Sequence, residues 1–157
     1  MKKYALTAAT AIAMISLIAG MSYSGGKPFY VSLNGATEVP GPGDPDGTGT
    51  FDMSVNPGSG EICYTLSWTA IDPATAAHIH LAPAGEAGPV VVALTLSGSN
   101  STTRCVSVDR ELARNIIRNP GSYYVNVHNV VYPSGAIRAQ LTSDDDDKND
   151  DDDDDKK

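Results

Sequence analysis

Apolar and polar residues alternate with a period of two through most of the chain, and this alternation limits the possible folds more than any other feature. Side chains two positions apart in a β-strand point to the same side, so each run predicts a strand with one buried face. The apolar positions that share a face are Phe29, Val31 and Leu33; Phe51, Met53 and Val55; Ile62, Tyr64, Leu66 and Trp68; Ile79 and Leu81; Val90 to Leu96; Val106 and Val108; Tyr123, Val125 and Val127; and Ile137 and Leu141. They predict about eight short strands.

Clusters of Gly and Pro separate these runs, at residues 40–47, 56–60, 84–89 and 132–135. Glycine permits positive φ and proline fixes φ near −65°, so such clusters end strands. Many short strands joined by such turns predict an all-β fold, a Greek-key β-sandwich or barrel.

One short helix is expected to interrupt the strands. Asp109 can cap its start, and Leu112 and Ile116 are spaced to lie on one face. Residues 119–121, Asn-Pro-Gly, end it. The arginines on its other side predict a solvated face.

The N-terminal residues have the pattern of an export signal. Residues 1–24 hold two lysines, an apolar run and then Ser22-Tyr23-Ser24, which are the three regions of a cleavable signal peptide. The apolar run is about 17 residues long, at the lower limit for spanning a bilayer, so an uncleaved anchor is the alternative. After cleavage we expect no membrane span and a secreted or extracytoplasmic protein, in a periplasm or at a cell surface.

The C-terminal residues 144–157 carry ten Asp and three Lys, so most of the formal net charge of −8 lies there. A run of like charges without apolar residues predicts a disordered Asp-rich tail. Such a tail could simply aid solubility, or could collect hard cations weakly. Residues 27–143 then form one β domain, and nothing in it is basic enough to indicate nucleic-acid binding.

Two cysteines, Cys63 and Cys105, lie in the predicted domain. An even pair in an exported chain favours a disulfide over free thiols. Each cysteine is out of phase with its apolar neighbours, so both are expected on the face away from the core. Asn100 begins a glycosylation sequon, whose use depends on the host.

The only three histidines are His78, His80 and His128. His78 and His80 alternate with Ile79, and His128 alternates with Val127, so all three imidazoles are expected to point outward. If the two strands are neighbours, the imidazoles converge on one outer patch. Three imidazoles suit copper or zinc and leave a coordination position open. The alternative is that the histidines are structural polar residues or lie partly buried under a loop.

Several motifs resemble the CHRD domain, a module described in chordin and found in many exported microbial proteins. They are Leu33-Asn34-Gly35-Ala36-Thr37-Glu38-Val39-Pro40, Ala77-His78-Ile79-His80, Gly88-Pro89-Val90-Val91, Tyr124-Val125-Asn126-Val127-His128 and Ser134-Gly135-Ala136-Ile137-Arg138-Ala139-Gln140-Leu141. The motifs stand in the family's order over about residues 30–142. Ala139 departs from the family's usual glycine, which concerns close packing more than chemistry.

The resemblance implies a barrel similar to that of copper–zinc superoxide dismutase, which holds copper on its outer face. There a His-x-His pair and a His from a later strand bind the metal, and these positions correspond to His78, His80 and His128. The chain has no fourth histidine to bridge two metals and no loop rich in His and Asp for zinc. Arg138 could lie near the patch, where packing or a strand-edge role is the simpler expectation.

Three functions remain open from the sequence. The first is a copper-binding protein for storage, delivery or a redox role, with the metal held by His78, His80 and His128. The second is a non-catalytic module that binds an extracellular or envelope protein and uses its histidines structurally. The third is a copper enzyme similar to superoxide dismutase, which the missing bridge and zinc ligands count against.

Overall fold

A computed structural model describes residues 25–142, which form eight strands and one α-helix. The strands are β1 (Lys27–Asn34), β2 (Thr48–Asn56), β3 (Glu61–Thr69), β4 (Ala74–Leu81), β5 (Val90–Leu94), β6 (Ser101–Ser107), β7 (Tyr123–Asn129) and β8 (Ile137–Gln140). The helix α1 spans Arg110–Arg118, and short 3-10 turns η1 and η2 span Gly35–Thr37 and Pro120–Ser122. The all-β fold predicted from the alternation, with one short helix, is confirmed.

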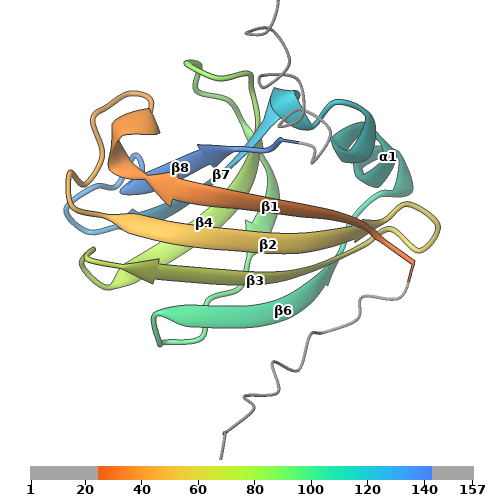
Figure 1. Cartoon of the computed structure of the whole chain (residues 1–157), viewed down its shortest axis with the longest axis horizontal. Helices are drawn as coiled ribbons and strands as arrows, with labels where there is room; N and C mark the ends of the chain where they lie inside the picture. The colour runs from red at the N-terminus through yellow and green to blue at the C-terminus, as the bar shows by residue number, and fades with distance from the viewer. Residues whose placement is uncertain (1–24, 143–157) are drawn as a thin grey trace, which may run out of the picture.

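The strands form one antiparallel sheet with the order β5-β4-β7-β8-β1-β2-β3-β6. The chain passes from β3 to β4 and from β6 to β7 without pairing those strands, and these crossovers give the Greek-key arrangement. Figure 1 shows β1, β2, β3 and β6 in front of β4, β7 and β8. The sheet curls so that its two outer strands, β5 and β6, approach each other.

Hydrogen bonds across this gap make the barrel nearly closed. The Tyr64 hydroxyl on β3 accepts a hydrogen bond from the Thr95 N–H (2.7 Å) and donates one to the Thr95 carbonyl (3.1 Å). The Thr102 hydroxyl of β6 donates to the same carbonyl at 3.2 Å. Side chains thus tie the segment after β5 to β3 and β6.

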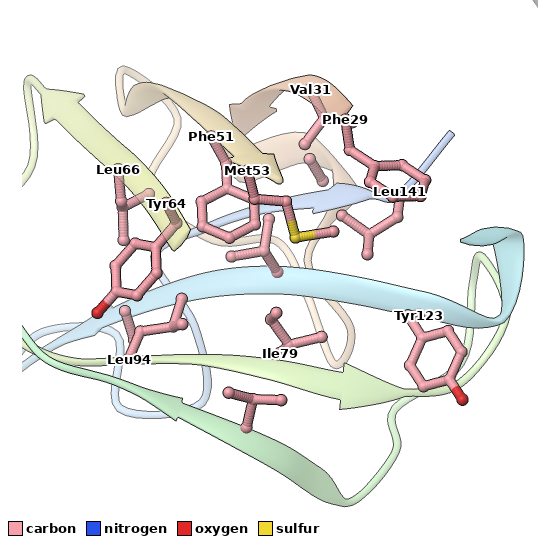
Figure 2. Packing of buried hydrophobic residues seen from close by; sticks show 14 of the residues in the cluster. Phe29, Val31, Phe51, Met53, Tyr64, Leu66, Ile79, Leu94, Tyr123 and Leu141 are labelled. Carbon is pink, nitrogen blue, oxygen red and sulfur yellow. The ribbon is translucent and has the colours of Figure 1, made fainter. Parts of the chain in front are cut away.

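The core lies between the two layers of the barrel, where apolar side chains from alternate positions meet (Figure 2). Phe51 and Met53 of β2 and Tyr64 of β3 face Ile79 of β4 and Leu94 of β5. All the apolar faces assigned from the alternation are represented in this cluster. Two residues were wrongly expected there: Leu81 is 42 % exposed and Val90 is 49 % exposed. They are the last residue of β4 and the first residue of β5, and the core does not extend over this end of the two strands.

The helix α1 lies beside one end of the barrel (Figure 1). Its cap is as predicted, because the Asp109 carboxylate accepts hydrogen bonds from the Glu111 and Leu112 N–H groups. Ala113 and Ile116 are its buried residues, and they join the barrel core.

The disulfide Cys63–Cys105 is present, as predicted. Cys63 of β3 and Cys105 of β6 are direct partners in the antiparallel register. Their shared parity therefore placed them on one face, and strand pairing placed them opposite each other.

The expected signal peptide and Asp-rich tail lie outside the described residues. Within residues 25–142, no helix has the length and apolar content needed to cross a membrane.

Candidate metal centre

The pairing of β4 with β7 brings the three histidines together on the outer face of the barrel. In this register His80 lies opposite Tyr124, His78 opposite Asn126, and His128 opposite Ala76. One ring nitrogen from each histidine lies within 4.8 Å of the other two. The sequence predicted the outward parity, and the structure shows that the two strands are neighbours.

Hydrogen bonds to backbone carbonyls determine which nitrogen two of these rings present. His80 Nδ1 lies 2.9 Å from the Gly88 carbonyl oxygen and His128 Nδ1 lies 3.1 Å from the Pro133 carbonyl oxygen. A carbonyl oxygen can only accept, so both Nδ1 atoms must carry the hydrogen. The Nε2 atoms of His80 and His128 are then unprotonated in the neutral rings, as a metal ligand must be.

The third ring, His78, presents Nδ1. This atom lies 3.1 Å from His128 Nε2, to which it donates a hydrogen bond when both rings are neutral. It would bind a metal after its hydrogen moves to its own Nε2. The candidate ligand set is therefore His78 Nδ1, His80 Nε2 and His128 Nε2.

These three nitrogens fit a single metal ion. Metal–nitrogen bonds of about 2.0–2.1 Å place two ligand nitrogens about 3.3–3.6 Å apart, close to the separation already found between His78 and His128. His80 Nε2 is buried and has no hydrogen-bond partner among the described residues. Such an atom is costly unless something binds it.

The electrostatics of the site favour the neutral forms of His78 and His128. Burial lowers the pKa of His78, and the neighbouring His128 and His80 lower it further. Burial also lowers the pKa of His128, although the hydrogen bond to Pro133 acts in the opposite direction. Neutral rings are the form that binds a metal, so the lowered pKa values reduce the competition of protons with a metal ion at this site.

A loop changes the expected picture of an open surface patch. Residues 82–89, here called the strap, join β4 to β5 and lie against the outer face. His80 is only 7 % exposed, whereas His78 and His128 are half-buried. The expectation of a surface site is therefore wrong for His80, because its ring hydrogen-bonds to the strap at Gly88.

Aromatic and cationic groups continue the outer layer beside His80. The Tyr124 ring stacks on the His80 ring, with centroids 4.6 Å apart and planes 7° apart. The Arg138 guanidinium lies 3.4 Å from the Tyr124 ring centroid. Because β7 lies between β4 and β8, Tyr124 separates His80 from Arg138.

Glu38 is a second buried ionisable group near this layer. It is 4 % exposed, and its Oε1 has no hydrogen-bond partner among the described residues. Gly135, at φ +146°, lies against the carboxyl group, and any side chain there would collide with it. Burial raises the pKa of Glu38 to about 7, against smaller opposing effects that include the Arg138 charge and the Asn126 amide.

Sequence reasoning identified the histidines but not the groups that orient them. The Gly88 and Pro133 acceptors are backbone carbonyls. Every residue has one, so the residue type does not predict which carbonyl accepts a hydrogen bond. Tyr124 and Asn126 had the outward parity, which was the available signal. No signal in the sequence indicated that Arg138 would be buried beneath the strap.

Comparison with known proteins gives one match. The model of the CHRD domain matches residues 29–141. No curated protein sequence and no solved structure matches the chain. The likeness of the site to that of copper–zinc superoxide dismutase therefore stays a prediction.

Proposed function

This chain belongs to the CHRD domain family, and from that premise we propose that it binds one copper ion outside the cytoplasmic membrane, through His78, His80 and His128. The Nε2 atom of His80 carries this proposal, because it is buried and has no hydrogen-bond partner within residues 25–142. A ring nitrogen that only packs in a fold is normally hydrogen-bonded. A metal ion shared with the other two histidines would satisfy it.

The donor set favours copper. Three imidazole nitrogens suit copper or zinc, and among divalent ions such a site binds copper most strongly. Among the described residues, no thiolate or carboxylate belongs to this histidine group, so that part of the chain adds none of the soft sulfur or hard oxygen ligands that favour other metals. The disulfide and the family are compatible with secretion, and outside the cytosol thiols compete less for copper.

The three histidines differ in whether they must change tautomer before they bind a metal. Gly88 and Pro133 hold the protons of His80 and His128 at Nδ1, so their Nε2 atoms can bind without a change of tautomer. His78 alone must move its proton. Three protein nitrogens would leave bound copper a coordination position for water or an exogenous ligand.

The test compares the full chain with His78→Ala, His80→Ala and His128→Ala combined. The acidic tail is the same in both proteins, so any difference in copper binding comes from the histidines. We expect the variant to lose about one copper per chain in metal analysis after gel filtration. The wild-type protein should show nitrogen hyperfine coupling from imidazoles in its Cu(II) spectrum.

Equal copper binding by both proteins would sink the proposal, because the tail would then account for the metal. Absence of copper from the wild type would do the same. In that case a lower melting temperature for His80→Ala alone would favour the structural role of the histidines.

A further inference from the structure

We propose that Arg138 is a positioning residue for this metal site: it holds the strap over His80 and thereby fixes the His80 tautomer that presents Nε2. The inference deepens the proposed function and rests on it for its effect on metal binding. Its effect on the tautomer can be measured without metal.

The strap is held mainly through its backbone. Apart from Ala82, which is buried, and Gly88, which is half-buried, its residues are exposed. Few apolar side chains therefore anchor it. Its carbonyl groups instead accept hydrogen bonds from side chains on the outer face of β8 and from His80.

Arg138 makes the central contacts. Its Nη1 donates to the Glu86 carbonyl at 2.9 Å, and its Nη2 donates to the Pro83 carbonyl at 3.3 Å. One guanidinium thus bridges two points of the strap, which the single ammonium of a lysine matches poorly. The side chain is 2 % exposed and stacks on Tyr124, so its position is defined on both sides.

The neighbouring side chain Gln140 extends the same support. Its Nε2 donates to the Ala82 carbonyl at 2.9 Å, and its Oε1 accepts from Arg138 Nη2 at 3.4 Å. The first residues of the strap are therefore fixed to β8 as well.

The contacts continue from the strap to His80 through Gly88. The Gly88 N–H donates to the Tyr124 hydroxyl at 3.3 Å, while its carbonyl accepts from His80 Nδ1. An added side chain at Gly88 would collide with the Leu81 carbonyl, so the strap lies very close to β4 here. The Leu81 N–H of β4 also donates to the Pro89 carbonyl at 3.0 Å. This bond and the Tyr124 hydroxyl hold the end of the strap at Gly88, while Arg138 holds the part of the strap that leads to it.

Loss of this support should release the His80 ring. With the strap displaced, Nδ1 loses its carbonyl acceptor, and the single hydrogen of the neutral ring can reside on either nitrogen. Part of the population then carries its hydrogen on Nε2, the atom that must bind the metal. Copper affinity falls although no ligand has changed, as is typical when partners of ligating histidines are removed.

The test uses Arg138→Gln in the full chain, with Arg114→Gln as the matched control. Arg114 lies on α1 and pairs with Glu111 at the surface, so its variant loses the same charge away from the site. In the metal-free proteins, ring ¹⁵N shifts report the His80 tautomer, and amide exchange reports the Leu81 and Gly88 N–H groups. Copper affinity is measured by competition with a chelator.

We expect wild type and Arg114→Gln to show the Nδ1–H tautomer. Arg138→Gln should show a mixture of tautomers, faster exchange at Leu81 and Gly88, and copper affinity lower by about tenfold. Arg138→Lys should fall between wild type and Arg138→Gln in tautomer population, amide exchange and copper affinity. An unchanged tautomer in folded Arg138→Gln overturns the inference.

If Arg138→Gln does not fold, Tyr124→Phe decides the matter, because it removes only the hydroxyl that accepts from Gly88. Tyr124→Phe should also raise the fraction of His80 rings that carry the hydrogen on Nε2, by a smaller amount than Arg138→Gln. An unchanged tautomer in Tyr124→Phe counts against the inference. Failure of the wild type to bind copper would refute the proposed function alone, since the tautomer is read without metal.

Discussion

Glu38 and His80 are both buried ionisable residues, and each has one polar atom without a hydrogen-bond partner in the described part of the chain. They differ in what could satisfy that atom. His80 Nε2 faces two other imidazoles, so a metal ion fits. Glu38 Oε1 belongs to a buried carboxyl group whose charged form is disfavoured by burial, although the Arg138 charge and the Asn126 amide act in the opposite direction. A proton on Glu38 would remove the buried charge, in agreement with the raised pKa of the carboxyl group.

Glu38→Gln should therefore remove a pH-dependent contribution to stability. The pKa of Glu38 rises from 4.5 in the unfolded chain to about 7 in the folded protein. Between these values the folded protein keeps a proton that the unfolded chain has released, so this contribution is complete below pH 4.5 and is lost as pH rises toward 7. The stability of wild type relative to Glu38→Gln should fall by on the order of 3 kcal/mol across this window.

Urea unfolding of the two proteins at several pH values measures this difference. The lowered pKa values of His78 and His128 act in the opposite direction, but they are common to both proteins and cancel in the comparison. A stability difference that does not change between pH 4.5 and 7 would show that folding does not raise the pKa of Glu38.

The elements differ in how locally they are specified. Helix α1 carries its own start signal in Asp109 and has two buried residues, Ala113 and Ile116. On its exposed side, Glu111 forms two ion pairs: its Oε2 lies 3.2 Å from Arg114 Nη1, and its Oε1 lies 3.9 Å from Arg118 Nη1. Such exposed pairs contribute little to stability, so the cap and the buried face should dominate.

Asp109→Ala should lower the free energy of unfolding by about 1 kcal/mol, because it leaves the Glu111 and Leu112 N–H groups without their acceptor. Asp72→Ala is a suitable control, since Asp72 is also exposed and the substitution removes the same charge without touching a helix end. Thermal unfolding followed by circular dichroism compares the two variants. Equal effects of the two substitutions would indicate that charge, and not the cap, matters.

At the scale of the whole molecule, the barrel depends on fixing its two outer strands. β5 and β6 are the ends of the sheet order, and unpaired strand edges are a hazard for association. Here the hydrogen bonds at Thr95 bridge the gap, and the Cys63–Cys105 disulfide ties β6 to β3. The histidines lie on β4 and β7, on strands that this bond does not join.

Cys63→Ser combined with Cys105→Ser should therefore lower stability while leaving copper affinity unchanged. The bond joins residues 42 positions apart, and a loop of this length corresponds to roughly 4 kcal/mol in the chain-entropy estimate. Denaturant unfolding measures the loss, and the reduced wild-type protein should show a similar one. Weaker copper binding in the folded double variant would contradict the separation of the two features.

The sequence by itself determined which residues share a face. Alternation with a period of two is a local property of strands, so it placed the core residues inward and His78, His80, His128, Cys63 and Cys105 outward. Residue types also indicated the strand ends and the cap of the helix. These predictions needed no knowledge of which strands pair.

Only the tertiary structure decided which strands are neighbours and what covers them. The pairing of β4 with β7 brought the histidines together, and the strap then buried His80 and fixed its tautomer through the Gly88 carbonyl. The raised pKa of Glu38 and the burial of Arg138 arise in the same way. These properties depend on contacts between distant segments and on backbone groups common to all residues, so no pattern of residue types could encode them.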